Sequence, residues 1–218
     1  MQHASEDAFA ASAETHEFDT LLFDMDGTII DSTPAIIKYW HQLGKEIGVD
    51  GDVVSHREGL VPKQYGSDAV EIEGSRALLD TITEAGIPWG IVTSGTRPLV
   101  TGWLDRMKLA IPETMVTAED VAKGKPDPAC YQLGAQRVAA TFKQPLARPE
   151  RTAVFEDAPA GIRAGKAAGY KVIALATTHS IDVVKAAGPD WIVKDMRSIT
   201  LAKSTTGHAS IKIEKALL

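Results

Sequence analysis

The sequence predicts an α/β fold built on a doubly wound (Rossmann-like) parallel sheet, and two observations support this prediction. Short apolar segments of strand length recur along the chain and are bounded by turn residues, which is typical of buried parallel strands. Helical patterns with one apolar face separate these segments. Such alternation implies right-handed crossovers that place helices on both faces of one sheet.

Six segments are predicted as strands of this sheet, and they cover residues 21–23, 88–93, 114–117, 152–156, 171–176 and 190–193. Helices are predicted between them, after Pro34, over residues 75–85, around residues 99–107, from about residue 129 and around residues 161–168. The small residues of this last helix would let it lie close to the sheet. The ending, residues 211–218, is compatible with either a strand or a helix.

Composition limits the class of protein. The chain has 218 residues, 44% of them hydrophobic and 24% charged, which fits one soluble domain with or without a small insert. Its net charge of -6 argues against nucleic acid or an anionic membrane as a partner. Residues 1–17 resemble no signal peptide and are predicted to be a disordered tail. No apolar segment is long enough to span a membrane, and the single cysteine, Cys130, suits a reducing compartment, so we expect a cytoplasmic protein.

Polar side chains follow several of the predicted strands at the point where each strand ends. Asp24 and Asp26 follow the first strand, the pair Ser94-Gly95 follows the second, and Glu156-Asp157 ends the fourth. Lys125 lies in a loop after the third strand. Because ligands of parallel sheets bind outside the carboxyl ends of the strands, we expect these groups to meet at one edge.

Asp24-Met25-Asp26-Gly27 by itself is equally compatible with an ordinary turn, because Asp and Gly are turn formers. A calcium-binding loop is excluded because Ile29 and Ala35 stand where that loop needs Gly and Glu. No glycine-rich dinucleotide fingerprint follows the first strand.

Four carboxylates at one edge would repel each other unless a cation lay among them. A hard metal with oxygen ligands resolves this, and Mg²⁺ suits few carboxylates, retained waters and a phosphate partner. Ser94, the backbone of Gly95 and the charge of Lys125 would then hold an anion beside it. Such a site fits phosphoryl transfer, with Asp24 as nucleophile and Asp26 as the group that gives and takes a proton.

These residues also resemble the four motifs of the haloacid dehalogenase-like phosphatases. The matching stretches are Phe23-Asp24-Met25-Asp26-Gly27-Thr28, Thr93-Ser94-Gly95, Lys125-Pro126 and Glu156-Asp157 followed by Ala160-Gly161. Residues 92–97 and 154–161 look most like the sugar- and polyol-phosphate phosphatases, a subgroup that includes enzymes acting on glycerol 3-phosphate and 2-deoxyglucose 6-phosphate. The resemblance implies Mg²⁺ bound by Asp24, the Asp26 carbonyl and Asp157, with Glu156 bound directly or through water. It also implies Ser94 and Lys125 on the phosphate.

In this subgroup a helical cap is inserted after the first strand. Four helices with their connections need about 60 residues, but Gly74 stands only 43 positions after Asp31. We therefore expect a shortened cap at residues 33–72 and a core made of residues 18–32 and 73–218.

The expected activity is Mg²⁺-dependent hydrolysis of a small sugar or polyol phosphate by a monomer or homodimer. Asp26 argues against a dehalogenase, because a leaving halide requires no proton. Two alternatives keep the same core residues, namely a phosphosugar mutase and a phosphatase-like protein that binds without turnover.

Overall fold

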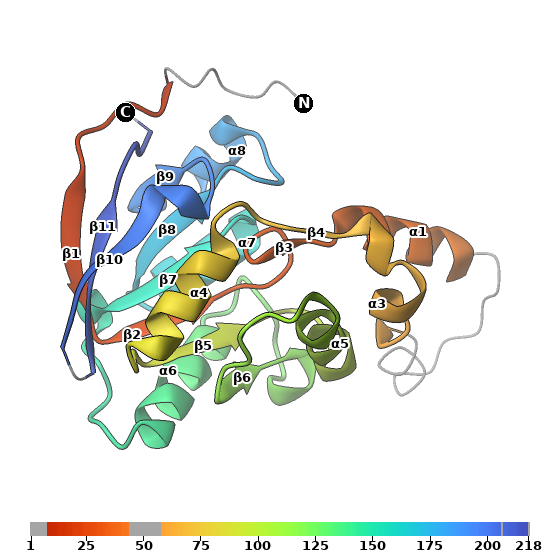
Figure 1. Cartoon of the computed structure of the whole chain (residues 1–218), viewed down its shortest axis with the longest axis horizontal. Helices are drawn as coiled ribbons and strands as arrows, with labels where there is room; N and C mark the ends of the chain where they lie inside the picture. Colours follow the sequence, from red (N-terminus) through yellow and green to blue (C-terminus); the bar gives the residue numbers. More distant parts are fainter. Residues whose placement is uncertain (1–7, 44–57, 206, 218) are drawn as a thin grey trace.

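The structure is a computed structural model that describes residues 8–43, 58–205 and 207–217 (Figure 1). Six parallel strands form its main sheet in the order β6-β5-β2-β7-β8-β9. These are β2 (Thr20–Phe23), β5 (Trp89–Val92), β6 (Thr114–Val116), β7 (Thr152–Glu156), β8 (Lys171–Leu175) and β9 (Trp191–Val193). This arrangement confirms the predicted doubly wound fold, and it places β2 and β7 side by side at the centre.

Helices cover both faces of this sheet. On one face lie α4 (Ser75–Glu84) and α5 (Arg97–Met107), and on the other lie α6 (Ala129–Thr141), α7 (Pro159–Ala167) and α8 (Ile181–Ala186). Alternate strand residues enter two hydrophobic clusters, so that Leu21 and Phe23 face α4 and α5 while Leu22 faces α6. The Phe23 ring stacks on Phe155 of the neighbouring strand, with a centroid distance of 4.2 Å, which fixes the register at the centre of the sheet.

A second sheet was not predicted. It consists of three antiparallel strands in the order β1-β11-β10, namely β1 (Glu14–Phe18), β10 (Ile199–Thr205) and β11 (His208–Ile213). The prediction of a disordered tail is therefore wrong for the described residues 8–17, since Glu14 pairs with Ile213 and Phe9 is buried. Residues 1–7 of that predicted tail lie outside the described part. The undecided ending is a strand up to Ile213.

The described residues 33–43 and 58–72, called the small lobe below, lie to one side of the sheet in Figure 1 and contain α1 (Thr33–Leu43) and α3 (Val61–Gln64). A two-stranded antiparallel sheet of β3 (Ile30–Asp31) and β4 (Val70–Glu71) joins this lobe to the core. Short 3₁₀ turns complete the elements, at η2 (Gly66–Asp68), η3 (Ala118–Asp120), η4 (Pro149–Arg151) and η5 (Met196–Ser198). The predicted cap thus has two described helices, and its residues 44–57 lie outside the described part.

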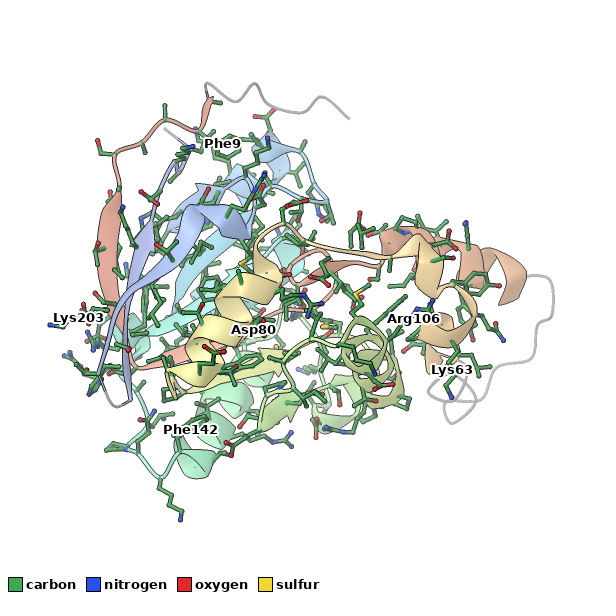
Figure 2. The ribbon with its side chains drawn as sticks, viewed as in Figure 1. Phe9, Lys63, Asp80, Arg106, Phe142 and Lys203 are labelled. Atoms are coloured by element: carbon green, nitrogen blue, oxygen red, sulfur yellow. The ribbon has the colours of Figure 1, made fainter. Side chains whose placement is uncertain are left out.

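The small lobe rests on α5. A Cβ at Gly102 of α5 would lie 2.9 Å from Pro62 of α3, so the two backbones can approach because this glycine has no side chain. Arg106, labelled beside α3 in Figure 2, packs against Gly66 in the same way. Within the residues that the structure describes, no helix is long and apolar enough to cross a bilayer.

Candidate active site

The central strand β2 delivers Asp24 to the carboxyl edge of the sheet. The Asp24 N–H donates to the Phe155 carbonyl at 3.0 Å, so the residue still follows the register of β7 as it leaves the strand. The chain then turns sharply at Gly27, whose φ of +91° is a conformation that glycine adopts readily. The Ile29 and Ile30 N–H groups donate to the Met25 carbonyl and close this turn. Asp24 and Asp26 are therefore held on a rigid loop.

Lys125 links two of the predicted carboxylates. Its Nζ lies 2.5 Å from Asp24 Oδ1 and 2.6 Å from Glu156 Oε1, and it also donates to the Val92 carbonyl at 3.1 Å. Burial lowers the pKa of the ammonium group, but the charges of Asp24 and Glu156 outweigh burial and raise the pKa above its ordinary value. Burial raises the pKa of Asp24 well above its usual range, although Lys125 opposes this. The lysine therefore stays charged.

Glu156 is held more tightly than its neighbours. Its Oε1 accepts from Tyr131 Oη at 2.9 Å as well as from Lys125, and its Oε2 accepts from the N–H groups of Asp157 and Ala158. A Cβ at Gly161 would collide with this carboxylate, so α7 needs glycine there to pass beside it. Glu156 is therefore oriented by the protein and has limited capacity left for a direct metal bond.

The carboxylates of Asp24, Glu156 and Asp157 form a buried cluster in which ligand oxygens lie within 4.8 Å of one another. Three carboxylates and one ammonium leave two negative charges uncompensated, and hard oxygen donors with that charge fit a divalent cation. Burial and the charge of Glu156 raise the pKa of Asp157 to about 7, although the Thr178 and Thr28 hydroxyls donate to its carboxylate. The residues present thus fit a metal ion of the Mg²⁺ type.

Asp26 lies apart from this acid cluster. Its Oδ1 accepts from the Ser32 hydroxyl, and its pKa is raised because burial outweighs that hydrogen bond. The charge of Glu58 raises it further. A carboxyl group with a raised pKa is suited to giving and taking a proton near neutral pH.

The predicted phosphate-binding turn follows β5. Ser94 is exposed, and among the described residues its side chain makes no hydrogen bond, whereas the Gly95 N–H donates to Thr93 Oγ1 at 3.0 Å. The Gly95 carbonyl accepts from Ala118 N and fixes the turn. The structure thus joins Asp24, Lys125, Glu156 and Asp157 directly, and it leaves Ser94 and Gly95 without a direct bond to them.

Sequence reasoning missed several residues that support the acids. They are Thr28 and Thr178 on Asp157, Ser32 on Asp26, Tyr131 on Glu156, and Thr177, whose hydroxyl donates to the Gly27 carbonyl at 2.5 Å. Thr177 and Thr178 follow the predicted strand at residues 171–176, so the rule applied to the other strand ends would have found them.

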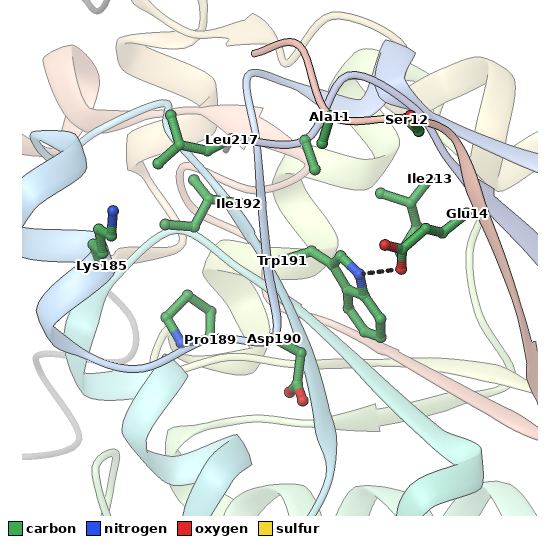
Figure 3. A pocket seen from close by; sticks show the side chains of 11 residues that line it. Ala11, Ser12, Glu14, Lys185, Pro189, Asp190, Trp191, Ile192, Ile213 and Leu217 are labelled. Carbon is green, nitrogen blue, oxygen red and sulfur yellow. Dashed lines mark hydrogen bonds between the residues drawn. The ribbon is translucent and has the colours of Figure 1, made fainter. Parts of the chain in front are cut away.

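A cavity of about 330 Å³ lies elsewhere, between β9 and the two end segments of the described chain. Figure 3 shows Trp191 and Ile192 lining it, with Glu14 accepting a hydrogen bond from the Trp191 indole at 3.1 Å. None of the acids at the end of β2 or β7 lines this cavity. It therefore gives no information about the catalytic chemistry.

Comparison with known proteins agrees with this geometry. A family model of the haloacid dehalogenase-like hydrolases matches residues 65–169. The glycerol-1-phosphate phosphohydrolase 1 of Saccharomyces cerevisiae is 35% identical over 212 residues, which cover 84% of this chain and 84% of the relative. The chain belongs to the haloacid dehalogenase-like hydrolases. This confirms the family predicted from the four motifs, and the phosphatases among its relatives confirm an enzyme of the phosphatase type.

Two further matches place this hydrolase within its family. The hexitol phosphatase A of Escherichia coli is 32% identical over 219 residues, covering 88% of this chain and 97% of the relative. A crystal structure of a haloacid dehalogenase-like hydrolase from Entamoeba histolytica has a TM-score of 0.66 at 20% identity, covering 83% of this chain and 95% of that one. The structural match supports the fold.

The alignments also show that this hydrolase is shorter than its relatives in the matched region. The alignment with the yeast enzyme is 212 positions long. It covers 84% of the 218 residues of this chain, which is only about 183 residues. About 29 positions of the yeast enzyme therefore have no counterpart in this chain. A shortened cap at residues 33–72 stays a prediction.

Proposed function

We propose that this hydrolase releases inorganic phosphate from a small sugar or polyol phosphate, through an aspartyl-phosphate intermediate and with Mg²⁺ as cofactor. The Asp24 carboxylate, held 2.5 Å from the Lys125 ammonium beside Asp157, carries the proposal because it combines a nucleophile with neutralising charge. The substrate class is supported by relatives whose names specify glycerol 1-phosphate and hexitol phosphates.

In the first step an Asp24 oxygen attacks phosphorus, the ester P–O bond breaks, and the leaving oxygen takes the proton of Asp26. In the second step water attacks phosphorus, its proton passes to Asp26, and the bond between phosphorus and Asp24 breaks. Lys125, Ser94 and Gly95 are proposed to hold the phosphoryl oxygens. Tyr131 and the N–H groups around Glu156 keep the lysine in place by orienting its partner.

Asp24 and Asp157, with the Asp26 carbonyl and with Glu156 directly or through water, are the groups that would hold Mg²⁺. When bound, the ion neutralises charge on the phosphate. Residues 33–72 are proposed to act as a small cap over this edge. A location in the cytoplasm and a monomeric or homodimeric state stay predictions.

The proposed activity is tested with a panel of phosphate esters. Purified protein with Mg²⁺ is expected to release phosphate from p-nitrophenyl phosphate, glycerol phosphates and hexitol phosphates, and a chelator is expected to abolish the release. Phosphate is measured colorimetrically, and sugar products are identified by chromatography. An isomerised sugar without net phosphate release would instead indicate the mutase, and binding without turnover would contradict both enzymes.

Mg²⁺ is expected to raise the melting temperature more at pH 8 than at pH 5. The folded-state pKa of Asp157 is about 7, raised from 3.8, so the group is protonated in the fold at pH 5 and protons compete with the metal there. As pH rises from 3.8 towards 7 without metal, the carboxyl group ionises in the unfolded state while the buried one keeps its proton, so the fold loses stability, and a bound cation offsets that loss. Differential scanning calorimetry at matched ionic strength measures both shifts. The metal site would be contradicted if Mg²⁺ raised the melting temperature equally at the two pH values. It would also be contradicted if Mg²⁺ raised the melting temperature of Asp157→Asn as much as that of the wild type.

A further inference from the structure

Glu58 is a half-buried acid of the small lobe, just before α3, and it contacts the core site. Its Oε2 accepts from the Thr96 N–H at 3.3 Å. Thr96 directly follows the Ser94-Gly95 turn that is proposed to hold phosphate, and it precedes α5. A carboxylate from the lobe therefore lies at the rim of the proposed phosphate site.

Glu58 also lies near Asp26, the acid that is proposed to protonate the leaving group, because its charge acts on that carboxyl group. The alcohol part of a phosphate ester departs on the side of Asp26, so Glu58 lies on the side of the alcohol. Among the described residues, the Thr96 N–H is the one hydrogen-bond donor to Glu58, while a carboxylate can accept about four hydrogen bonds.

The Thr96 side chain supplies an independent observation. Only 8% of the residue is exposed, and its hydroxyl has no hydrogen-bond partner among the described residues. Buried polar groups in native proteins are nearly always paired, and an exception needs an explanation. A ligand hydroxyl could both accept from Thr96 and donate to Glu58, which would satisfy both groups.

We propose that Glu58 accepts a hydrogen bond from a hydroxyl group of the alcohol part of the substrate, with the Thr96 hydroxyl as a second contact once the ester separates the lobe from α5. This inference rests on the proposed polyol phosphatase activity and adds a residue that determines its specificity. The subsite selects esters with a free hydroxyl near the phosphorylated carbon, because an ester without one leaves the buried groups unpaired.

Glu58 could instead act only as a carboxylate that accepts a hydrogen bond at the start of α5. In that case its removal would lower activity on all esters alike and would not change the preference between them. Glu119 has that role as well, since its two carboxylate oxygens accept from the Arg97 N–H at 3.0 and 3.2 Å. The charge of Glu58 acts on Asp26, whereas Glu119 is not among the groups that act on it. Glu119→Ala is therefore a matched control for loss of a carboxylate at this helix end.

The experiment compares glycerol 3-phosphate with propane-1,3-diol monophosphate, which lacks the middle hydroxyl, and with p-nitrophenyl phosphate. For the wild type, removal of that hydroxyl is expected to lower kcat/KM by about 10- to 100-fold. In Glu58→Ala this preference is expected to fall to about threefold or less, chiefly through a higher KM for glycerol 3-phosphate. Glu58→Gln keeps an acceptor oxygen and is expected to retain part of the preference, and Thr96→Val is expected to lose part of it.

The outcomes separate this inference from the proposed function. If the wild type releases phosphate from none of the esters, the proposed function fails. If the wild type prefers glycerol 3-phosphate but Glu58→Ala lowers kcat/KM equally for all three esters, only the inference is overturned. The inference also fails if Glu119→Ala reduces the preference as much as Glu58→Ala, or if the wild type shows no preference. Melting temperatures of all variants establish that each is folded.

Discussion

Asp24→Asn is expected to reduce phosphatase activity by at least about 10⁴-fold while the protein stays folded. The amide nitrogen and oxygen cannot replace the carboxylate as nucleophile, so no aspartyl phosphate can form. The substitution also removes the negative charge that Lys125 contacts at 2.5 Å, which weakens the positioning of the lysine. Phosphate release from p-nitrophenyl phosphate with Mg²⁺ measures the loss.

The same variant is expected to be as stable as the wild type without metal, or more stable. Burial raises the pKa of Asp24, which means that the ionised carboxylate destabilises the fold as pH rises above its unfolded value of 3.8. A neutral amide of the same shape removes that cost. Asp80→Asn, on the exposed face of α4, is the control and should leave activity unchanged. A clearly lower melting temperature for Asp24→Asn, or activity within tenfold of the wild type, would contradict the assignment.

The main sheet was predictable because its strands are buried on both faces. Segments such as Thr152–Glu156 have an apolar centre and are buried at every position, and their observed bounds agree with the predicted ones within a residue or two. The antiparallel sheet was not predictable in the same way. β1 has the sequence ETHEF, in which only Phe18 is fully buried. It pairs with β11, which lies nearly two hundred residues further along the chain, as in the pair Glu14 and Ile213. Pairing of backbones at that distance leaves no local pattern in the sequence.

The acids were predictable for a different reason, since parallel topology brings the carboxyl ends of neighbouring strands together. Asp24 and Asp157 follow β2 and β7, which the structure places side by side. The residues that hydrogen-bond to these acids cannot be predicted from strand ends when they lie on helices. Tyr131 lies within α6, where its ring looks like any other core residue of an apolar face. Glu58 is placed by the docking of α3 on α5, which depends on tertiary contacts between the lobe and the core.

Lys125→Met is expected to destabilise the protein by about 3–5 kcal/mol near pH 8, in addition to abolishing most of the activity. The ammonium lies between two carboxylates, and its side chain is only 6% exposed. Without it, Asp24, Glu156 and Asp157 would hold three uncompensated acid groups within one buried cluster. Denaturant unfolding without metal measures the loss. It should be smaller at pH 5, because the raised carboxyl pKa values let the folded state take up protons there.

The double variant Lys125→Met/Glu156→Gln separates stability from catalysis at this site. Removing the Glu156 charge together with the lysine leaves fewer buried charges unpaired. The amide oxygen of Gln can accept from the loop N–H groups, which now donate to Glu156 Oε2, and its NH₂ group can donate to the Tyr131 hydroxyl oxygen. The double variant is therefore expected to regain at least half of the stability lost in Lys125→Met. Activity should not return, because the Lys125 ammonium that is proposed to hold the phosphate is still missing. If the two single substitutions were simply additive in unfolding free energy, the ion pair would not be the cause of the loss.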